Sequence, residues 1–495
     1  MPIDRPLPPC PGPSRSASPC ATRRQFLRRA GLGCGWLGLA AILREEGLLA
    51  DSDPAASPRS SLPPGPLSPK APHFAARARN VIFLFMSGGP SHVDLFDPKP
   101  ELLRLAGQPI PESFGTFKTR RNVAKNKLLP PLRPFRQRGQ CGMAISDLMP
   151  HLALHADELC LLRGCYGDSV THPESVYLMN TGSILMGRAS LGAWATYGLG
   201  TENQNLPAFV VLPDPGGWVK GGAPAWGNGY LPAAYQGTLL RGGLSPILHL
   251  ETPPGITAEQ QSATVDFINR LNRQALPPGE EQSELAARIA SYELAFRMQR
   301  HAPQVVDLAG ESEATKKLYG LEQKVTSEFG TRCLLARRLV EAGVRVVQLY
   351  CGDTNGWDGH SDMEGNHSKL CAASDLPVAG LLTDLKARGL LDSTLVIWGG
   401  EFGRMPMSEG SNGRDHNPHG FSMWLAGGGV RPGQIIGATD DVGLRAVAER
   451  AHVHDIHATI LHLLGLNHER LTFRHNGRDE RLTDVAGRVI EKAIA

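Results

Sequence analysis

The chain has 495 residues, of which 41% are hydrophobic and 20% are charged, and this composition is typical of a globular protein with a large core. The 51 basic and 48 acidic residues leave a formal net charge of +3. Such a balance gives no reason to expect nucleic acid or an acidic membrane surface as the main partner.

The N-terminal segment is predicted to be an export signal. Thr22–Arg28, "TRRQFLR", resembles the twin-arginine export motif, and an apolar run, Ala30–Leu43, follows it. The run has 14 residues, is rich in Gly and Ala and is flanked by arginines, which suits a signal peptide better than a spanning helix. We therefore assign residues 1–50 to a twin-arginine signal peptide. The alternative is a short amphipathic helix in a cytoplasmic protein.

The motif implies export through the twin-arginine machinery to the periplasm or the cell exterior. No apolar run reaches the roughly 18–20 residues of a membrane-spanning helix, so we expect no transmembrane anchor after processing. Proteins that take this route are usually folded before export, often with a metal or cofactor in place. The leader therefore also suggests a bound metal.

A proline-rich stretch separates the leader from the rest of the chain. Asp51–Pro72 has seven prolines in 22 residues, so we predict a disordered linker over residues 51–76. No second linker of this kind follows, and residues 77–495 are interpreted as one domain. Six of the nine cysteines lie in that domain, without CxxC or zinc-ribbon spacing. We expect most of them to be small buried hydrophobic residues, although an exported protein can form disulfides.

The domain alternates short apolar runs with helical patterns. The runs predicted as strands buried on both faces are 80–86, 158–164, 208–213, 344–350, 393–399 and 421–427. Apolar residues at helical spacing predict helices over 283–301, 329–343 and 375–390. The alternation of strands and helices indicates an α/β sandwich with a mainly parallel central sheet.

Acidic and histidine side chains gather where these strands end. They follow the first strand (His92, Asp94), follow the strand 344–350 (Asp358, His360), follow 393–399 (Glu401) and precede 421–427 (His416). In parallel sheets the carboxyl ends of the strands meet at one edge, where ligands bind. Since buried carboxylates that lack a counter-charge are costly, the pattern predicts a divalent metal at this edge.

Glu401 stands at the end of the strand in "LVIWGGEFGRMP". We predict that it is a metal ligand or lies next to one. The alternative is a buried ion pair with Arg404 or Arg414. A second histidine-rich stretch, "AHVHDIHATILHLLGL" (451–466), is interpreted differently, because its helical period favours capping and packing over metal binding.

Several segments resemble the alkaline phosphatase and sulfatase superfamily, and within it a twin-arginine-exported, sulfatase-like bacterial family, the domain of unknown function fifteen-oh-one. The similar segments are "MSGGPSHVDLFDPKP", "SLGAWATYGLGTENQNLPAFVVL", "ARIASYELAFRMQ", "TKKLYGL", "WGGEFGRMP", "GRDHNPHGFSMWLAGGG", "HVHDIHATILHLLGL" and "FRHNGRDERLTD". The resemblance implies an alkaline phosphatase-like three-layer α/β sandwich over residues 77–495.

The resemblance also implies a metal site. Asp358 and His360, in "WDGH", resemble a ligand pair of the superfamily, Glu401 falls near its Asp-His pair, and His416 falls at the single His before the next strand. His92 and Asp94 follow the first strand, where the superfamily places one or two Asp ligands. One or two divalent ions are implied, with zinc favoured and calcium, magnesium or manganese as alternatives.

The nucleophile is less well matched. The superfamily places it at the start of a helix some ten residues before a Thr-Gly pair, which is Thr181-Gly182 here, and this spacing leads back to Thr171 and His172. Thr171 could attack with its hydroxyl or simply cap the helix, and His172 could attack or bind metal. The free N–H groups of the helix start suit an anion. The Cys-x-Pro-Ser-Arg motif is absent, which disfavours a formylglycine sulfatase.

These observations predict an exported, metal-dependent hydrolase of phosphate or sulfate esters, in which Arg404 or Arg414 clamps the anion. The expected substrate is a small molecule or a glycan ester. The alternative is a non-catalytic envelope protein that uses the same fold to bind a glycan or a protein.

Overall fold

The computed structural model describes residues 65–241, 247, 255–275 and 284–495, and the compact unit that contains them begins at Pro64. The predicted leader and residues 51–64 of the predicted linker lie outside the described residues. Residues 65–76 run along the domain. The N–H of Lys70 donates to the carbonyl of Leu199 at 2.9 Å, and that of His73 donates to Gly465 at 2.9 Å.

A nine-stranded sheet is the central element of the described chain. Its strand order is β12 (Gln434–Ile436), β4 (Leu159–Tyr166), β11 (Phe421–Ala426), β8 (Thr394–Gly399), β1 (Asn80–Met86), β7 (Val346–Cys351), β5 (Phe209–Leu212) and β6 (Thr238–Leu239), and β15 (Ala451–His452) also pairs with β4. Only β11, among these described strands, runs antiparallel to its neighbours. All six predicted strands are present, and the predicted mainly parallel α/β fold is confirmed.

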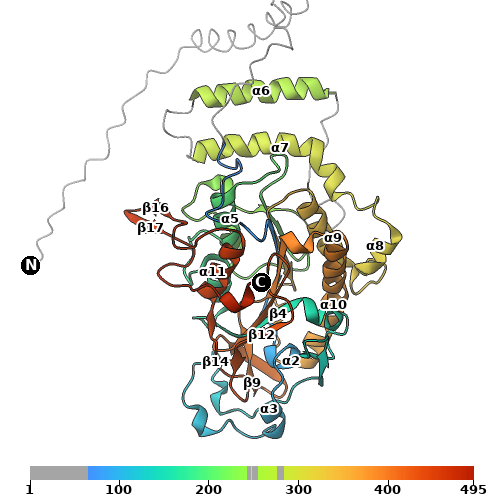
Figure 1. Ribbon diagram of the computed structural model, residues 1–495, viewed down its shortest axis with the longest axis vertical. Coiled ribbons are helices and arrows are strands. Elements are labelled where there is room, and N and C mark those ends of the chain that lie inside the picture. Colours follow the sequence, from blue (N-terminus) through green and yellow to red (C-terminus); the bar gives the residue numbers. More distant parts are fainter. Residues whose placement is uncertain (1–64, 242–246, 248–254, 276–283) are drawn as a thin grey trace, which may run out of the picture. The chain divides into compact units, whose positions relative to one another are not determined.

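Helices cover both faces of this sheet (Figure 1). They are α4 (His172–Thr181), α5 (Leu191–Leu199) and α11 (Val453–Leu463) on one face, and α9 (Ser327–Glu341) and α10 (Met363–Ala387) on the other. Val81, Phe83 and Phe85 of β1 join the first core, whereas Ile82 and Leu84 join the second. Since successive side chains of a strand point to opposite faces, β1 can be apolar throughout.

Three predicted helices correspond to α7 (Glu284–Val306), α9 and α10, but α10 begins earlier than predicted. Asp362 caps it by accepting the N–H of Gly365 at 2.9 Å. Residues 363–374, for which the sequence predicted no helix, are therefore helical. His367 is buried in α10, where its Nε2 accepts the N–H of Ser91 at 2.9 Å.

The described part also contains four further α-helices and four hairpins outside the central sheet. These are α2 (His92–Leu95), α3 (Pro100–Arg104), α6 (Ala258–Ala275) and α8 (Glu313–Leu318), and the hairpins β2 (Phe135–Arg138)–β3 (Met143–Ser146), β9 (Gly403–Glu409)–β10 (Gly413–Asn417), β13 (Ala438–Thr439)–β14 (Ala446–Ala448) and β16 (Phe473–His475)–β17 (Arg478–Glu480). Among the described residues, no helix combines the length and apolar character needed to cross a membrane.

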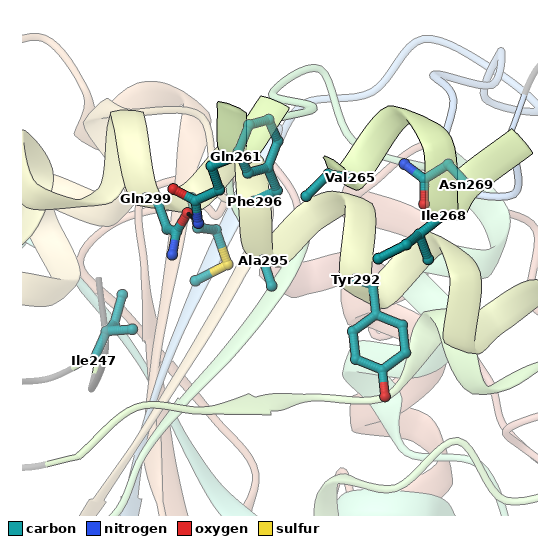
Figure 2. Close-up of a pocket in the computed structure, with 10 residues that line it drawn as sticks. Ile247, Gln261, Val265, Ile268, Asn269, Tyr292, Ala295, Phe296 and Gln299 are labelled. Carbon is teal, nitrogen blue, oxygen red and sulfur yellow. Dashed lines mark hydrogen bonds between the residues drawn. The ribbon is translucent and has the colours of Figure 1, made fainter. Parts of the chain in front are cut away.

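Helix α6 lies alongside α7 (Figure 1). Between them is a cavity of about 500 Å³, and Figure 2 shows Val265, Ile268, Tyr292 and Phe296 among the residues that line it. Its lining residues include none of the predicted site residues. The cavity is therefore separate from the candidate site described below.

The histidine-rich stretch 451–466 has structural roles. His452 and Asp455 form a capping box at the start of α11. His457 is buried in the core, with its Nε2 2.8 Å from the carbonyl oxygen of Met179. The six cysteines of the domain are all free thiols, and five of them are buried.

Candidate metal centre

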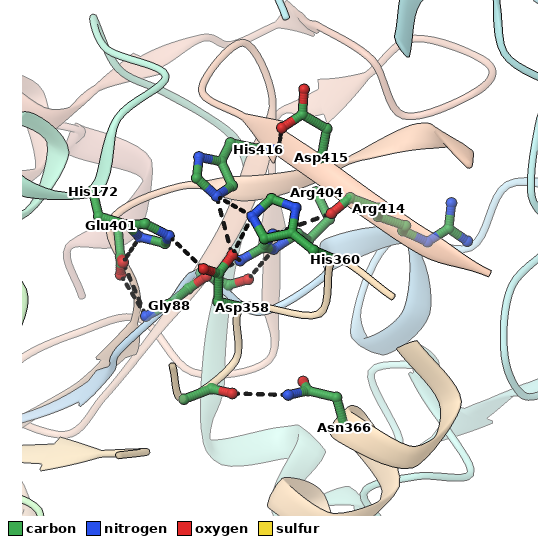
Figure 3. A network of polar contacts seen from close by, with 12 residues as sticks. Gly88, His172, Asp358, His360, Asn366, Glu401, Arg404, Arg414, Asp415 and His416 are labelled. Carbon is green, nitrogen blue, oxygen red and sulfur yellow. Dashed lines mark hydrogen bonds and ion pairs between the residues drawn. The ribbon is translucent and has the colours of Figure 1, made fainter. Parts of the chain in front are cut away.

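Four of the predicted site residues meet at the carboxyl edge of the sheet (Figure 3). Asp358 and His360 lie in the loop after β7, and His416 lies in β10 of the hairpin that connects β8 to β11. His172 is the first residue of α4, which follows β4. Because β4, β7 and β8 run parallel, the segments after them emerge at the same edge.

Three imidazole rings surround the carboxylate of Asp358. Nε2 of His172 lies 2.9 Å from Oδ2, Nε2 of His360 lies 2.9 Å from Oδ1, and Nε2 of His416 lies 3.0 Å from Oδ1. One ligand atom from each of the four residues lies within 4.8 Å of all the others. Tetrahedral zinc with ligands at about 2.0–2.1 Å separates them by about 3.3 Å, so the cluster fits an ion of this size.

The other nitrogen of each ring is held by a hydrogen-bond acceptor. Nδ1 of His172 lies 2.7 Å from Oε1 of Glu401, Nδ1 of His416 lies 2.7 Å from the carbonyl of Val170, and Nδ1 of His360 contacts the carboxylate of Glu409. Each acceptor places the proton on Nδ1, so Nε2 carries the lone pair. All three lone pairs are therefore available to a cation.

Two further observations fit a cation. Nε2 of His360 and Nε2 of His416 lie 3.0 Å apart, so two lone pairs face each other. Nε2 of His172 is buried and has no hydrogen-bond partner among the described residues, although Oδ2 of Asp358 lies 2.9 Å away. An unpartnered buried nitrogen is costly unless a ligand occupies the site. The donor set thus suits a divalent metal.

The charge of Asp358 is stabilised from several sides. Burial alone would raise its pKa, but the three neighbouring imidazoles and the charge of Arg404 hold the pKa far below its usual value. Burial lowers the pKa of His416 to about 2, so its imidazole is neutral. A carboxylate and neutral imidazoles are the forms that bind a metal.

Phe402 fixes two of the rings. Its side chain is buried, and its ring centroid lies 4.4 Å from that of His416 and 4.9 Å from that of His172. Packing of this kind restricts the rotamers of both histidines, which preorganises the nitrogen atoms that face Asp358.

Arg404 lies beneath the cluster and is fully buried. It donates to Oδ1 of Asp358 at 2.7 Å, to the carbonyl of Gly89 at 2.9 Å and to that of Arg414 at 3.1 Å. These partners all belong to the protein, so the guanidinium supports Asp358 and is not directed at solvent.

Arg414, His92 and Asp94 lie outside the four-residue cluster. Arg414 is fully buried and pairs with Asp94 at 2.9 Å, and it also donates to the carbonyls of Pro406, at 2.9 Å, and Leu129, at 3.1 Å. Nε2 of His92 lies 2.7 Å from the carbonyl of Gly443. The sequence predicted these three residues as metal ligands or as an anion clamp. In the structure they lie outside the cluster around Asp358.

Glu401 is adjacent to the cluster. Its side chain is fully buried, and Oε1 accepts the N–H of Gly88 at 2.9 Å as well as the contact from His172. A carboxylate in this position orients a metal-binding histidine and raises its basicity.

Thr171 is the N-cap residue of α4, but its side chain makes no capping hydrogen bond. Its Oγ1 lies 3.3 Å from Oγ of Ser169, and the next residue is His172 of the cluster. Since both nitrogens of His172 face acidic side chains, that ring is positioned to bind a metal. The hydroxyl of Thr171 is not committed to the helix start.

Lys220 was missed by the sequence reasoning. Its Nζ lies 2.8 Å from Oδ2 of Asp358, and its side chain is 20% exposed. Lys220 lies in the loop after β5, a strand that the sequence predicted, so reading the residues beyond that strand would have found it. Glu409, the partner of His360, lies at the end of β9, a strand that the sequence did not predict.

Residues 78–494 match the model of a family described as "Protein of unknown function (DUF1501)". No curated protein matches the chain. Among solved structures, the PsFucS1 sulfatase from Pseudoalteromonas sp. is 13% identical, with a TM-score of 0.34 over 79% of this chain and 69% of that one. The lipoteichoic acid synthase LtaP from Listeria monocytogenes is 10% identical (TM-score 0.33; 84% and 78% covered). Alkaline phosphatase from the Antarctic bacterium TAB5 is also 10% identical (TM-score 0.31; 79% and 99% covered).

Proposed function

The chain belongs to the DUF1501 family, whose description assigns no activity, and we propose that it is an exported, metal-dependent hydrolase of phosphate or sulfate esters. One observation carries this proposal: three Nε2 atoms converge on the Asp358 carboxylate, while each Nδ1 is held by an acceptor. This arrangement suits the binding of a metal ion, and it lies at the edge of the sheet where α/β proteins bind ligands.

His172, Asp358, His360 and His416 would hold the metal. Zinc is favoured over calcium, magnesium and manganese, because three imidazoles outnumber the single carboxylate. When bound, such an ion polarises an ester oxygen and lowers the pKa of an attacking hydroxyl. We keep Glu401 and Glu409 as residues that orient the histidines, and we leave His92 and Asp94 out of the ligand set.

Thr171 is the proposed nucleophile. Its hydroxyl is adjacent to His172 and is not used for capping, and the free N–H groups at the start of α4 suit an anionic ester. We assign the clamping of the anion to Lys220, since Arg404 and Arg414 are buried and bound to other protein groups.

A non-catalytic binding protein is the second candidate. Four protein ligands complete a tetrahedral coordination, as in structural zinc sites, whereas catalytic sites usually retain an open position. The two candidates differ in whether Asp358 is a metal ligand. Both of its oxygens also contact cations of the protein, Arg404 and Lys220, and a carboxylate held by these cations would leave one coordination position open for a substrate.

Metal analysis and kinetics test the proposal together. We expect about one zinc per purified chain, and release of p-nitrophenol from the phosphate or sulfate ester. H360A and H416A should lose both metal and activity, T171A should retain metal and lose activity, and H301A, at an exposed position in α7, should retain both. Stoichiometric metal without turnover of either ester would favour the binding protein.

The proposed export is tested separately. Replacing Arg23 and Arg24 of the leader motif by lysine should keep the protein in the cytoplasm of an expressing bacterium, as followed by fractionation. An unchanged periplasmic or extracellular fraction would remove the twin-arginine route.

A further inference from the structure

The loop after β5, Asp214–Gly222 ("DPGGWVKGG"), presents an exposed aromatic side chain close to the metal cluster. Trp218 is 85% exposed, although tryptophan is highly buried on average. It lies two residues from Lys220, whose Nζ is 2.8 Å from Oδ2 of Asp358. The Cα atoms of Trp218 and Lys220 can therefore be no more than about 7.6 Å apart.

The loop is fixed to the elements that carry the metal ligands. The N–H of Trp218 donates to Oγ1 of Thr354 at 3.0 Å, and Thr354 belongs to the loop that carries Asp358 and His360. On the other side, the hydroxyl of Tyr177 in α4 donates to the carbonyl of Gly221 at 2.8 Å. The backbone that carries Trp218 is thus held at a defined place relative to the cluster.

Gly217 makes the first of these attachments possible. A Cβ at this position would lie 2.2 Å from the backbone nitrogen of Thr354, so only glycine allows the two loops to approach this closely. This close approach places the backbone of Gly217, the residue before Trp218, against the loop that carries Asp358 and His360.

We propose that Trp218 and Lys220 form a subsite for a sugar ring that carries the anionic ester. The indole would stack on the apolar face of the ring, and the ammonium group of Lys220 would contact the ester oxygens. This inference rests on the proposed function, since it takes the ester to lie at Asp358. Nucleobases also stack on tryptophan, so AMP serves as a competing probe.

Calorimetric titration of the metal-loaded full chain tests the subsite. The probes are a disaccharide with one sulfate, the same disaccharide with one phosphate, the unmodified disaccharide, and AMP. W218A should weaken the binding of charged and neutral disaccharides by about tenfold, W218F should weaken it less, and K220Q should weaken only the charged ones. L154A, which removes a side chain that is 79% exposed, is the control and should leave all affinities unchanged.

Equal affinities of W218A and the unmodified protein would overturn the subsite, and so would the absence of disaccharide binding. Preferential binding of AMP that is lost in W218A would replace the sugar by a nucleobase. Binding that depends on Trp218 without release of sulfate or phosphate would support the subsite and remove the hydrolase. If the protein hydrolysed the esters and W218A bound the disaccharides with unchanged affinity, the hydrolase would be supported and the subsite removed.

Discussion

Oε1 of Glu401 lies 2.7 Å from Nδ1 of His172, across the ring from the nitrogen that faces Asp358. The same carboxylate accepts the N–H of Gly88 at 2.9 Å, which ties the end of β1 to the start of α4. Glu401 therefore acts on the cluster through His172. This contact explains why a buried strand ends in a carboxylate.

E401Q should lower zinc affinity by about 10–100-fold and still bind one ion at saturation, because the amide orients His172 less firmly. H172A should lower the zinc affinity far more, since it removes a ligand atom. Competition with a chromophoric chelator measures both. E409Q is the matched variant, because Glu409 has the same relationship to His360. If E401Q abolished binding as completely as H172A, Glu401 would be a ligand itself.

Asp94 and Arg414 form a pair in which both side chains are fully buried. D94N should destabilise the fold by about 3–5 kcal/mol, because it leaves the guanidinium without its counter-charge. It should not change the number of metal ions bound. Urea unfolding of the metal-free protein and metal analysis give the two readouts.

The control for this prediction is E101Q, which breaks an exposed pair with Arg104 and should leave stability unchanged. A D94N variant of normal stability that had lost one metal ion would restore Asp94 to the ligand set predicted from the sequence.

Six of the nine strands of the central sheet were predictable because they are largely buried and form nearly continuous apolar runs, whereas the short strands β6, β12 and β15 were not predicted. Thr394–Gly399 and Phe421–Ala426 lie within one residue of their predicted bounds at each end. The hairpin β9–β10 was not predicted, because polar residues needed at the site interrupt its apolar pattern. The first turns of α10 were missed for the same reason, since polar residues interrupt their apolar pattern.

For the site, the sequence could name residues that follow strands, but it could not give the direction of their side chains. His416 and Arg414 are two residues apart in β10, yet one contacts Asp358 and the other contacts Asp94. Their separation depends on the register of β10 against β9, which is irregular between Arg414 and His416. That bulge has no signature in the sequence pattern.

G88A should disrupt the metal site. Gly88 has a φ of +104°, and a Cβ there would lie 2.7 Å from the backbone nitrogens of Trp357 and Asp358. The turn that presents Asp358 would have to move, so zinc affinity should fall by at least about tenfold, and stability should fall as well. Chelator competition and urea unfolding report these changes.

G107A is the matched control for G88A, because Gly107 has a φ of +77° but no atom within 4 Å of the added Cβ. It should lose some stability through backbone strain and keep its zinc affinity. Equal losses of zinc affinity in both variants would mean that the overlap with the Asp358 turn is unimportant.

His457 should make the fold sensitive to acid. Burial lowers its pKa to about 3, whereas the unfolded chain has the ordinary value near 6.5. The unfolded state therefore binds the proton first, so stability is complete above about pH 6.5 and falls by up to about 1.4 kcal/mol per pH unit as the pH drops toward 3. H457Q keeps a donor near the carbonyl of Met179 and does not titrate, so its metal-free urea midpoint should depend less on pH between 6 and 4 than that of the unmodified protein. H301Q, at an exposed position, should have the same pH dependence as the unmodified protein. If the urea midpoint of H457Q changed with pH as much as that of the unmodified protein, His457 would not be the origin of the acid sensitivity.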